Sequence, residues 1–299
     1  MVIIAFQAST TGGDLHCLLL VRLQQTTKTF SMELTFGNAQ VYTSNRLKKH
    51  PSIAQVFNKV FGYTNVGNYA RFTIFKKLIK QVGLPTQAKI LDVGTGYGEY
   101  AISLAKALPK AEINALDIDL DRIGVLNEAI SKLDLTNLRT FGCKVDQLSM
   151  AQFDFIFSID VFEHIAPENM PFQSCYDKLL PGGKFMVKIP NNEQRTILPE
   201  KYFEEHQEWL DEEHIGQVYN LEGLVERFKS HGFDIEHASY SDGWLSRLGW
   251  ELAYLGKKIG IVGQLLSLPI AKLFIHLDRV FHHNRWGNAI QVIGKKPLS

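Results

Sequence analysis

The stretch LDVGTGYG, residues Leu91–Gly98, decides the fold of this chain of 299 residues. It follows a short apolar run and precedes a helical pattern that begins near Tyr100. Glycines at such a turn let the backbone bend tightly and approach a ligand closely. The next apolar run ends in Asp117, where a carboxylate can bind ribose hydroxyls. The spacing G-x-G-x-G differs from the dinucleotide-binding G-x-G-x-x-G, which argues against NAD.

Apolar runs and helical patterns alternate from this turn onward, as they do in a parallel α/β sheet covered on both faces. We expect seven strands, at Lys89–Val93, Glu112–Asp117, Leu138–Phe141, Phe153–Ser158, Lys184–Ile189, Phe233–Tyr240 and Ala289–Gly294. We expect helices at Tyr100–Ala107, Ile123–Lys132, Phe172–Leu180 and Leu221–His231. The helix at Phe172–Leu180 is expected to end at Pro181-Gly182-Gly183.

The part of the chain before the first strand has a different pattern. Residues 1–31 lack coherent periodicity, so we expect a poorly ordered extension or an upstream start-site artefact. Residues 32–84 are expected to form a helical cover, with helical spacing from Ser52 to Val82 interrupted at 61–68. Gly83 and Pro85 are typical of the end of a helix.

The composition is that of an ordinary globular protein, with 45% hydrophobic and 21% charged residues. A formal net charge of +1 gives no global electrostatic reason to expect nucleic acid as a partner. Three scattered cysteines define no disulfide framework, which favours a reducing compartment. The N-terminus lacks the basic region of a signal peptide, and no apolar run reaches the roughly 18 residues of a membrane span. We therefore expect a cytoplasmic location, with membrane association left open.

Four blocks in the same order resemble the class I S-adenosylmethionine-dependent methyltransferases, of the small-molecule type 11 or 12. They are LDVGTGYGEYAISLA (Leu91–Ala105), INALDID (Ile113–Asp119), FDFIFSIDVFEHI (Phe153–Ile165) and LLPGGKFMVKIP (Leu179–Pro190). A weaker fifth block covers Glu212–Ile235. The resemblance implies a Rossmann-like seven-stranded sheet whose last strand is antiparallel and lies beside the sixth. It also implies S-adenosylmethionine as the cofactor.

The resemblance assigns cofactor contacts residue by residue. The glycine loop would line the amino-acid end of the cofactor, Asp117 would bind the ribose, and Ile118 or Asp119 would lie against adenine. Asp146 is a candidate for the adenine amino group, although a solvated loop carboxylate explains it equally well. The full predicted set is Asp92, Gly94, Thr95, Gly96, Gly98, Asp117, Ile118, Asp119, Asp146 and Asp160.

Candidate proton acceptors follow the fourth strand. Asp160 and His164 stand at the carboxyl edge where such sheets bind ligands. Alternatively, His164 caps or packs the next helix. His214, in an acidic stretch that the resemblance treats as a lid loop, is a third catalytic candidate or a solvated surface residue.

The pattern D-x-x-E-H at residues 160–164 resembles the E-x-x-E-H of ubiquinone-biosynthesis and small-RNA methyltransferases, which hold a divalent metal. Here Asp160 replaces the first Glu and shortens that arm. The second His of the RNA-type motif is missing nearby in the sequence. We therefore assign no metal ligand.

Residues 244–286 form an insertion into a core that we assign to residues 85–243 and 287–299. The insertion is apolar, holds six basic and two acidic residues, and is expected to form two helices that break at Pro269. Packing on the core, a lid over an apolar substrate, a dimer interface and a membrane-interface contact through 244–283 all remain open.

These features predict a methyltransferase that acts on a small or lipid-like acceptor, with oxygen as the favoured atom. Methylation of RNA or protein is an alternative, as is a non-catalytic scaffold that keeps the fold. No nucleic-acid partner is expected, and a homodimer is compatible with the sequence.

Overall fold

The structure is a computed structural model that describes residues 34, 63, 65–215 and 219–298, without the side chains at 209, 211 and 261. These residues all belong to one unit of the chain, Met32–Ser299. The expected extension at 1–31 and the first expected helix before residue 61 lie outside the described residues.

The seven predicted strands form one sheet in the order β3-β2-β1-β4-β5-β7-β6. Neighbours from β3 to β5 are parallel, whereas β7 is antiparallel to both β5 and β6. This confirms the predicted placement of the last strand. The strands are β1 (Lys89–Val93), β2 (Glu112–Leu116), β3 (Leu138–Phe141), β4 (Phe153–Ile159), β5 (Leu179–Pro190), β6 (Asp234–Ser241) and β7 (Ala289–Lys295).

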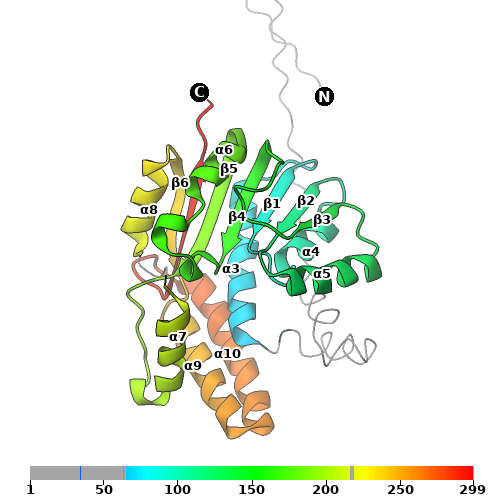
Figure 1. Ribbon diagram of the computed structural model, residues 1–299. Coiled ribbons are helices and arrows are strands. Elements are labelled where there is room, and N and C mark those ends of the chain that lie inside the picture. Colours follow the sequence, from blue (N-terminus) through cyan, green and yellow to red (C-terminus); the bar gives the residue numbers. More distant parts are fainter. Residues whose placement is uncertain (1–33, 35–62, 64, 216–218, 299) are drawn as a thin grey trace, which may run out of the picture. The chain divides into compact units, whose positions relative to one another are not determined.

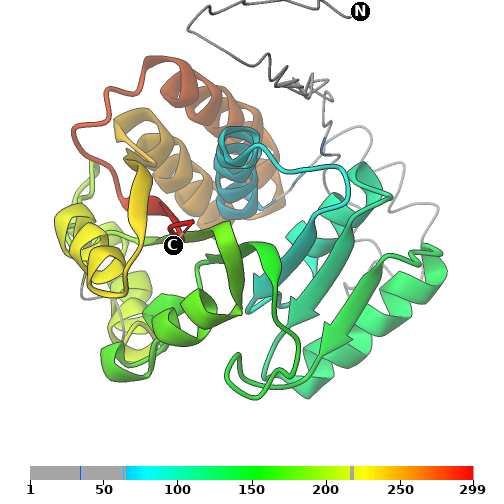
Figure 2. The ribbon, with the colours of Figure 1, turned by 90° about the horizontal axis from the view of Figure 1, so that it is seen from above.

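Helices cover both faces of the sheet, as the sequence predicts. One apolar core joins β1, β2 and β4 to α3 (Val66–Val82), α4 (Glu99–Ala107) and α5 (Leu120–Lys132). A second core, on the other face, includes α6 (Phe172–Lys178) and α8 (Leu221–Ser230). Figure 2 shows α3 on the opposite side of the sheet from α6.

The central strand β4 is the apolar axis of both cores. Phe155 and Phe157 are fully buried toward α3, where the rings of Phe75 and Phe157 lie 5.3 Å apart. Phe153 and Ile156 face the other core. A strand covered on both faces is apolar at nearly every position, which explains why FDFIFS could be assigned from the sequence.

The helix predicted at Phe172–Leu180 does not extend to Pro181-Gly182-Gly183. Strand β5 begins at Leu179 and runs through these residues, and α6 ends at Lys178, two residues earlier than expected. A side chain at Gly183 would lie 2.8 Å from the Leu180 carbonyl and 2.9 Å from that of Phe153. Glycine here therefore permits a close approach of strands at an irregularity in the β4–β5 pairing.

The acidic stretch expected to be a lid loop is a helix, α7 (Glu204–Glu213). A short 3₁₀ turn at Glu200–Tyr202 directly precedes α7. Two further 3₁₀ turns, at Phe162–His164 and Pro167–Asn169, lie earlier in the chain, between β4 and α6. Aromatic contacts attach the first turn of α7 to the insertion, since the His206 and Trp250 rings lie 4.8 Å apart. The local sequence is dominated by acidic residues and gave no sign of a helix. The aromatic side chains that pack against the first turn of α7 come from the distant insertion.

The insertion forms an antiparallel helical hairpin of α9 (Trp244–Ile259) and α10 (Ile261–Phe281), at the same end of the sheet as α7 (Figure 1). The predicted break at Pro269 is wrong, because α10 continues through it and the chain reverses at Gly260, with φ of 107°. Proline removes one helical hydrogen bond, but only glycine readily adopts this positive φ. In the described part of the chain, no helix is long and apolar enough to cross a membrane.

Close packing of the hairpin depends on Gly256. A Cβ there would lie 2.7 Å from the Gly263 carbonyl and 2.3 Å from Ser267 Oγ. We predict that Gly256→Ala lowers the free energy of unfolding by roughly 1–2 kcal/mol, because overpacking outweighs the gain in helix propensity. Urea denaturation followed by circular dichroism measures this change. Gly124→Ala, in α5 with open space around it, is the control and should be neutral or stabilising. Equal effects of the two substitutions would contradict the packing argument.

Candidate functional site

A large cleft opens at the carboxyl ends of β1, β2, β4 and β5, with a volume of about 1530 Å³. The glycine loop after β1 forms one end of it. The residues after β4, the start of α3, the end of α7 and the first turns of α9 form the other. The cleft therefore holds nearly all of the predicted site residues, from segments far apart in the sequence.

The glycine loop has the backbone that its sequence predicts. Gly94, Gly96 and Gly98 have φ values of 74°, 55° and 78°, a region that favours glycine. A Cβ at Gly94 would lie 2.5 Å from Val161, and one at Gly98 would lie 2.3 Å from Leu126. Nothing lies within 4 Å of the corresponding position at Gly96, so the loop presents bare backbone to the cleft.

Asp92 lies beneath the loop, as predicted. Thr95 Oγ1 donates a hydrogen bond of 2.7 Å to its Oδ2. Burial raises the pKa of Asp92 from 3.8 to about 7, although the bond from Thr95 opposes the shift. The two side chains thus support the loop from inside the protein.

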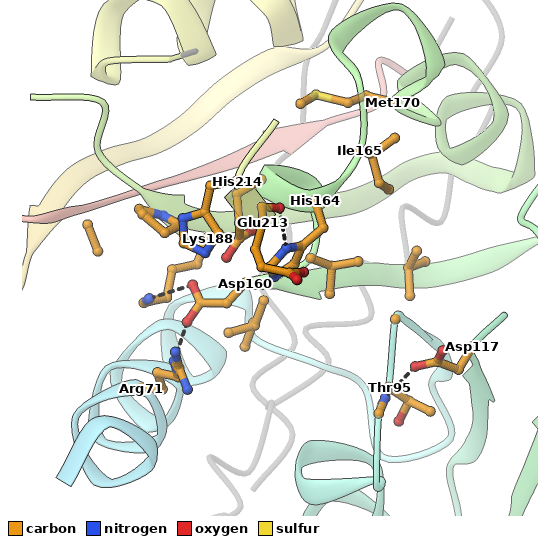
Figure 3. Close-up of a pocket in the computed structure, with 18 of the residues that line it drawn as sticks. Arg71, Thr95, Asp117, Asp160, His164, Ile165, Met170, Lys188, Glu213 and His214 are labelled. Atoms are coloured by element: carbon orange, nitrogen blue, oxygen red, sulfur yellow. Dashed lines mark hydrogen bonds and ion pairs between the residues drawn. The ribbon is translucent and has the colours of Figure 1, made fainter. Parts of the chain in front are cut away.

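Asp117 faces the glycine loop across this end of the cleft (Figure 3). Its Oδ2 accepts the Gly96 N–H at 2.7 Å, and its Oδ1 accepts the Asp119 N–H at 2.9 Å. The carboxylate at the end of β2 is therefore held in a fixed orientation beside the loop, as a ribose-binding residue must be.

The predicted adenine-side residues also line the cleft, but in different ways. Ile118 is 71% exposed and offers a flat apolar side chain. Asp119 is the N-cap of α5, accepting the Asp121 and Arg122 N–H groups, so its carboxylate serves the helix. Asp146 is exposed at the cleft edge, which leaves both interpretations of it open.

The loop, the carboxylate and the apolar surface fit a nucleoside that carries an amino acid. The backbone of the glycine loop accommodates a polar group at close range, Asp117 offers carboxylate oxygens to hydroxyls, and Ile118 gives a base a surface to lie on. The chain thus has the groups needed to hold the cofactor that the resemblance implies.

Asp160 is tied into an ion-pair network rather than poised as a base. Its φ is 52°, and its carboxylate binds Lys188 Nζ at 2.9 Å and the guanidinium of Arg71. Burial would raise the pKa of Asp160, but the charges of Lys188 and Arg71 outweigh burial and hold it below its ordinary value. Figure 3 shows the three side chains meeting at one side of the cleft.

Sequence reasoning missed Arg71 and Lys188. Lys188 is 2% exposed and stands inside the apolar strand KFMVKI, which is a signal that could have been used, since an unpaired buried lysine is costly. Arg71 gave no comparable signal, because it stands at an ordinary helix position.

Glu163 is a further cleft residue that we did not assign. Its side chain is 2% exposed, and its Oε2 has no hydrogen-bond partner among the described residues. Burial raises the pKa of Glu163 to about 8, and the negative charge of Asp160 adds to the shift. Burial and the neighbouring charge therefore favour the neutral form of this carboxyl group. Such perturbed groups in a cleft are typical of functional sites.

His164 and His214 come together at the mouth of the cleft, with ring centres 4.9 Å apart. His164 Nδ1 lies 2.9 Å from the Glu213 carbonyl oxygen, at the end of α7. Because a carbonyl only accepts, this contact places the hydrogen on Nδ1 and leaves Nε2 as the basic nitrogen. Hence α7 orients the imidazole, which local sequence could not show.

The side chains of Glu163, His164 and His214 offer ligand atoms that all lie within 4.8 Å of one another, so they could hold a divalent metal ion. The second histidine that the sequence lacks nearby is thus supplied from a distant helix. The absence of a metal stays a prediction.

Comparison with known proteins gives these features a context. A model described as a methyltransferase domain matches residues 68–238, which is more than half of the chain. The chain belongs to this methyltransferase domain family. It is 23% identical over 247 residues to the phosphoethanolamine N-methyltransferase of Plasmodium falciparum, covering 82% of this chain and 86% of that protein.

Solved structures share the fold. The chain resembles phosphoethanolamine N-methyltransferase 2 of Haemonchus contortus, in complex with phosphomonomethylethanolamine and S-adenosylhomocysteine. The TM-score is 0.55 and the identity 18%, and the match covers 88% of this chain and 61% of that one. A putative sarcosine dimethylglycine methyltransferase from Galdieria sulphuraria matches with a TM-score of 0.52 and 19% identity, over 75% of this chain and 84% of that one.

The protein is thus a methyltransferase, as predicted, and it shares its fold with structures solved with S-adenosylmethionine or S-adenosylhomocysteine. When bound, S-adenosylmethionine supplies a methyl group activated by its attachment to a positively charged sulfur. The chain itself must hold the cofactor, orient the acceptor and remove a proton where the acceptor requires it.

We predict that Asp117→Ala weakens binding of S-adenosylmethionine by roughly ten- to a hundredfold, the value of hydrogen bonds to a charged group. Isothermal titration calorimetry measures the dissociation constant. Asp121→Ala is the matched control, because Asp121 stands on the exposed side of α5 and does not line the cleft. An unchanged dissociation constant in a folded Asp117→Ala variant would contradict the assigned role.

Asp92 makes a second prediction, on stability. Its raised pKa means that the folded state binds a proton more tightly than the unfolded state does, so stability is lost as pH rises from about 4 to about 7. Asp92→Asn removes this component, and its free energy of unfolding should fall less over this range. Chemical denaturation at several pH values measures it. Parallel pH dependences of wild type and variant would show that Asp92 is ionised in both states.

Proposed function

We propose that this methyltransferase transfers a methyl group to a hydroxyl oxygen of a small or lipid-like acceptor. The observation that carries the proposal is the orientation of His164. Its Nδ1 is bonded to the Glu213 carbonyl, so its Nε2 is available as a proton acceptor at the mouth of the cleft. A hydroxyl must lose a proton as its oxygen gains a methyl group, and imidazole is the usual group for this step.

The two carboxyl groups near His164 are poor candidates for the proton acceptor, which supports the choice of His164. Asp160 is stabilised as an anion by Lys188 and Arg71, which makes it a weak base. Burial and the charge of Asp160 raise the pKa of Glu163, which favours its neutral form. A protonated carboxyl group at the cleft floor can donate a hydrogen bond to the acceptor and help to orient it.

The other cleft walls favour a compact, partly apolar acceptor over a nucleic acid. The first turns of α9 contribute Trp250, whose ring stacks on Tyr254, together with Arg247. Exposed acidic residues, Glu212 and Glu213, stand at the mouth. Negative charge at the entrance repels a phosphate backbone, which argues against RNA.

A second candidate is methylation of an amine nitrogen on a phosphorylated amino alcohol. The comparisons favour it, because proteins named phosphoethanolamine N-methyltransferase recur among the relatives and the fold matches. An ammonium acceptor must also lose a proton before it attacks, so the His164 argument applies to both atoms.

An acceptor panel separates the two candidates. Purified protein with S-adenosylmethionine is offered phosphoethanolamine, hydroxyl-bearing aromatic compounds and a total lipid extract, and S-adenosylhomocysteine is measured. Mass spectrometry then locates the added methyl group. Turnover of hydroxyl compounds or lipids alone supports the oxygen proposal, whereas turnover of phosphoethanolamine overturns it. Metabolite and lipid profiling of a deletion strain then seeks the natural acceptor as a species lighter by one methyl group.

With an active acceptor found, we predict that His164→Gln lowers kcat by roughly 10²–10⁴-fold, the contribution of a general base, and leaves binding of S-adenosylmethionine unchanged. Steady-state kinetics and calorimetry measure the two quantities. His276→Gln is the control, since His276 is exposed on α10 and outside the cleft. Wild-type kcat in His164→Gln would assign the base to another group.

A further inference from the structure

The outer face of α10 faces solvent and is apolar apart from the exposed His276. Exposed helix faces of globular proteins are normally polar. Here the side chains on this face are between 46% and 67% exposed. They are Val262, Leu265, Leu266, Ile270, Leu273, Val280 and Phe281, a set that we call the α10 stripe. Most of them are three, four or seven residues apart, and such spacings place side chains on the same side of a helix. Ile259, 80% exposed, extends the stripe around the tip of the hairpin.

The opposite face of α10 is also apolar, but it is packed. Leu268, Ala271 and Ile275 are buried against Val66 of α3. The helix therefore carries apolar side chains on its exposed face as well as on its buried face, which is expected of a helix that meets a further apolar environment. Because the buried side already has its partner, the α10 stripe is not needed to hold the hairpin on the domain.

The acidic residues of the hairpin are both buried. Glu251 accepts hydrogen bonds from the Ile197 and Leu198 N–H groups and pairs with Arg247. Asp278 accepts bonds from the Gly243 N–H and from Ser246.

Basic residues, in contrast, reach the surface at the tip of the hairpin. Lys257 and Lys258 are exposed beside Gly260, and Lys258 Nζ pairs with Glu205 of α7 at 3.1 Å. Lys272 lies along the helix, half-buried over the ring of Tyr69. Lys257 is thus the exposed basic residue at the tip of the hairpin that takes part in no ion pair with the described residues.

From this combination we infer that the α10 stripe docks on an anionic membrane surface. Apolar side chains enter the boundary between head groups and acyl chains, and Lys257 at the tip binds a lipid phosphate. The hairpin lies on the bilayer and does not cross it, since no helix among the described residues has the length and hydropathy to do so.

The hairpin lies beside the substrate cleft, so docking through α10 would bring the cleft close to the membrane. The inner side of α9 lines the cleft through Ser246, Arg247 and Trp250, while the α10 stripe is exposed to solvent. Docking would place the substrate cleft next to the bilayer, where an acceptor of lipid character is concentrated. The docking itself does not depend on which acceptor is methylated.

Vesicle co-sedimentation of the full chain tests the inference without any turnover. We expect the protein to sediment with vesicles of phosphatidylcholine and phosphatidylglycerol, and at least tenfold less with phosphatidylcholine alone. Raising the salt concentration should weaken binding, because the lysine contribution is screened. Lys257→Gln should weaken binding to anionic vesicles by several-fold, consistent with the value of one basic residue near a charged membrane.

The decisive variant is the double substitution Leu266→Glu and Leu273→Glu, which should reduce the bound fraction at least tenfold. Leu298→Glu is the matched control, since Leu298 is 72% exposed and belongs to the C-terminal segment, at the other end of the sheet from the hairpin (Figure 1). Circular dichroism and binding of S-adenosylmethionine confirm that each variant is folded.

Three results would overturn the inference. They are a failure of the intact chain to sediment with anionic vesicles, equal binding of the Leu266→Glu/Leu273→Glu variant, and a dimer in light scattering that this variant dissociates. The last result would assign the α10 stripe to a second copy of the chain.

Discussion

The carboxylate of Asp160 is the interaction on which the cleft depends. It stands where β4 ends and binds Lys188 of β5 and Arg71 of α3, so that one anion joins three elements from distant parts of the chain. The Lys188 arm is buried, and loss of one partner from a buried pair leaves an uncompensated charge that costs about 3–5 kcal/mol. Asp160 also raises the pKa of neighbouring Glu163, and so its charge helps to keep a proton at the cleft floor.

A second network attaches the hairpin to this arrangement. Arg279 of α10 pairs with Asp242, which lies just before α9, at 2.8 Å, and it donates to the Ala70 carbonyl of α3 at 3.0 Å. Because α3 carries Arg71 one residue further on, the hairpin and the ion-pair network around Asp160 share the same turn of helix. The insertion is therefore a part of the cleft wall, held by buried charges as well as by apolar packing.

The hairpin of α9 and α10 keeps most of its charged residues buried or half-buried and exposes an apolar face. Its two acidic residues accept hydrogen bonds from backbone N–H groups, and two of its arginines form ion pairs within the protein. What remains for the surface is a long apolar face and a few lysines. Counting charges in the sequence showed an excess of basic residues, but the structure shows which of them solvent can reach.

The resemblance of its sequence blocks identified the class of the protein. The sequence by itself determined the positions of the seven strands along the chain and the glycine loop. Those features depend on local patterns, namely apolar runs bounded by glycines and a carboxylate one strand further on. It failed where the deciding partner was remote. Neither Gly260 as the hairpin turn, nor α7 as a helix, nor the strand through Gly182 and Gly183 could be predicted from neighbours alone. Only the tertiary structure joined His164 to His214 and Asp160 to Arg71, because side chains separated by tens of residues interact only when the sheet brings their elements to one edge.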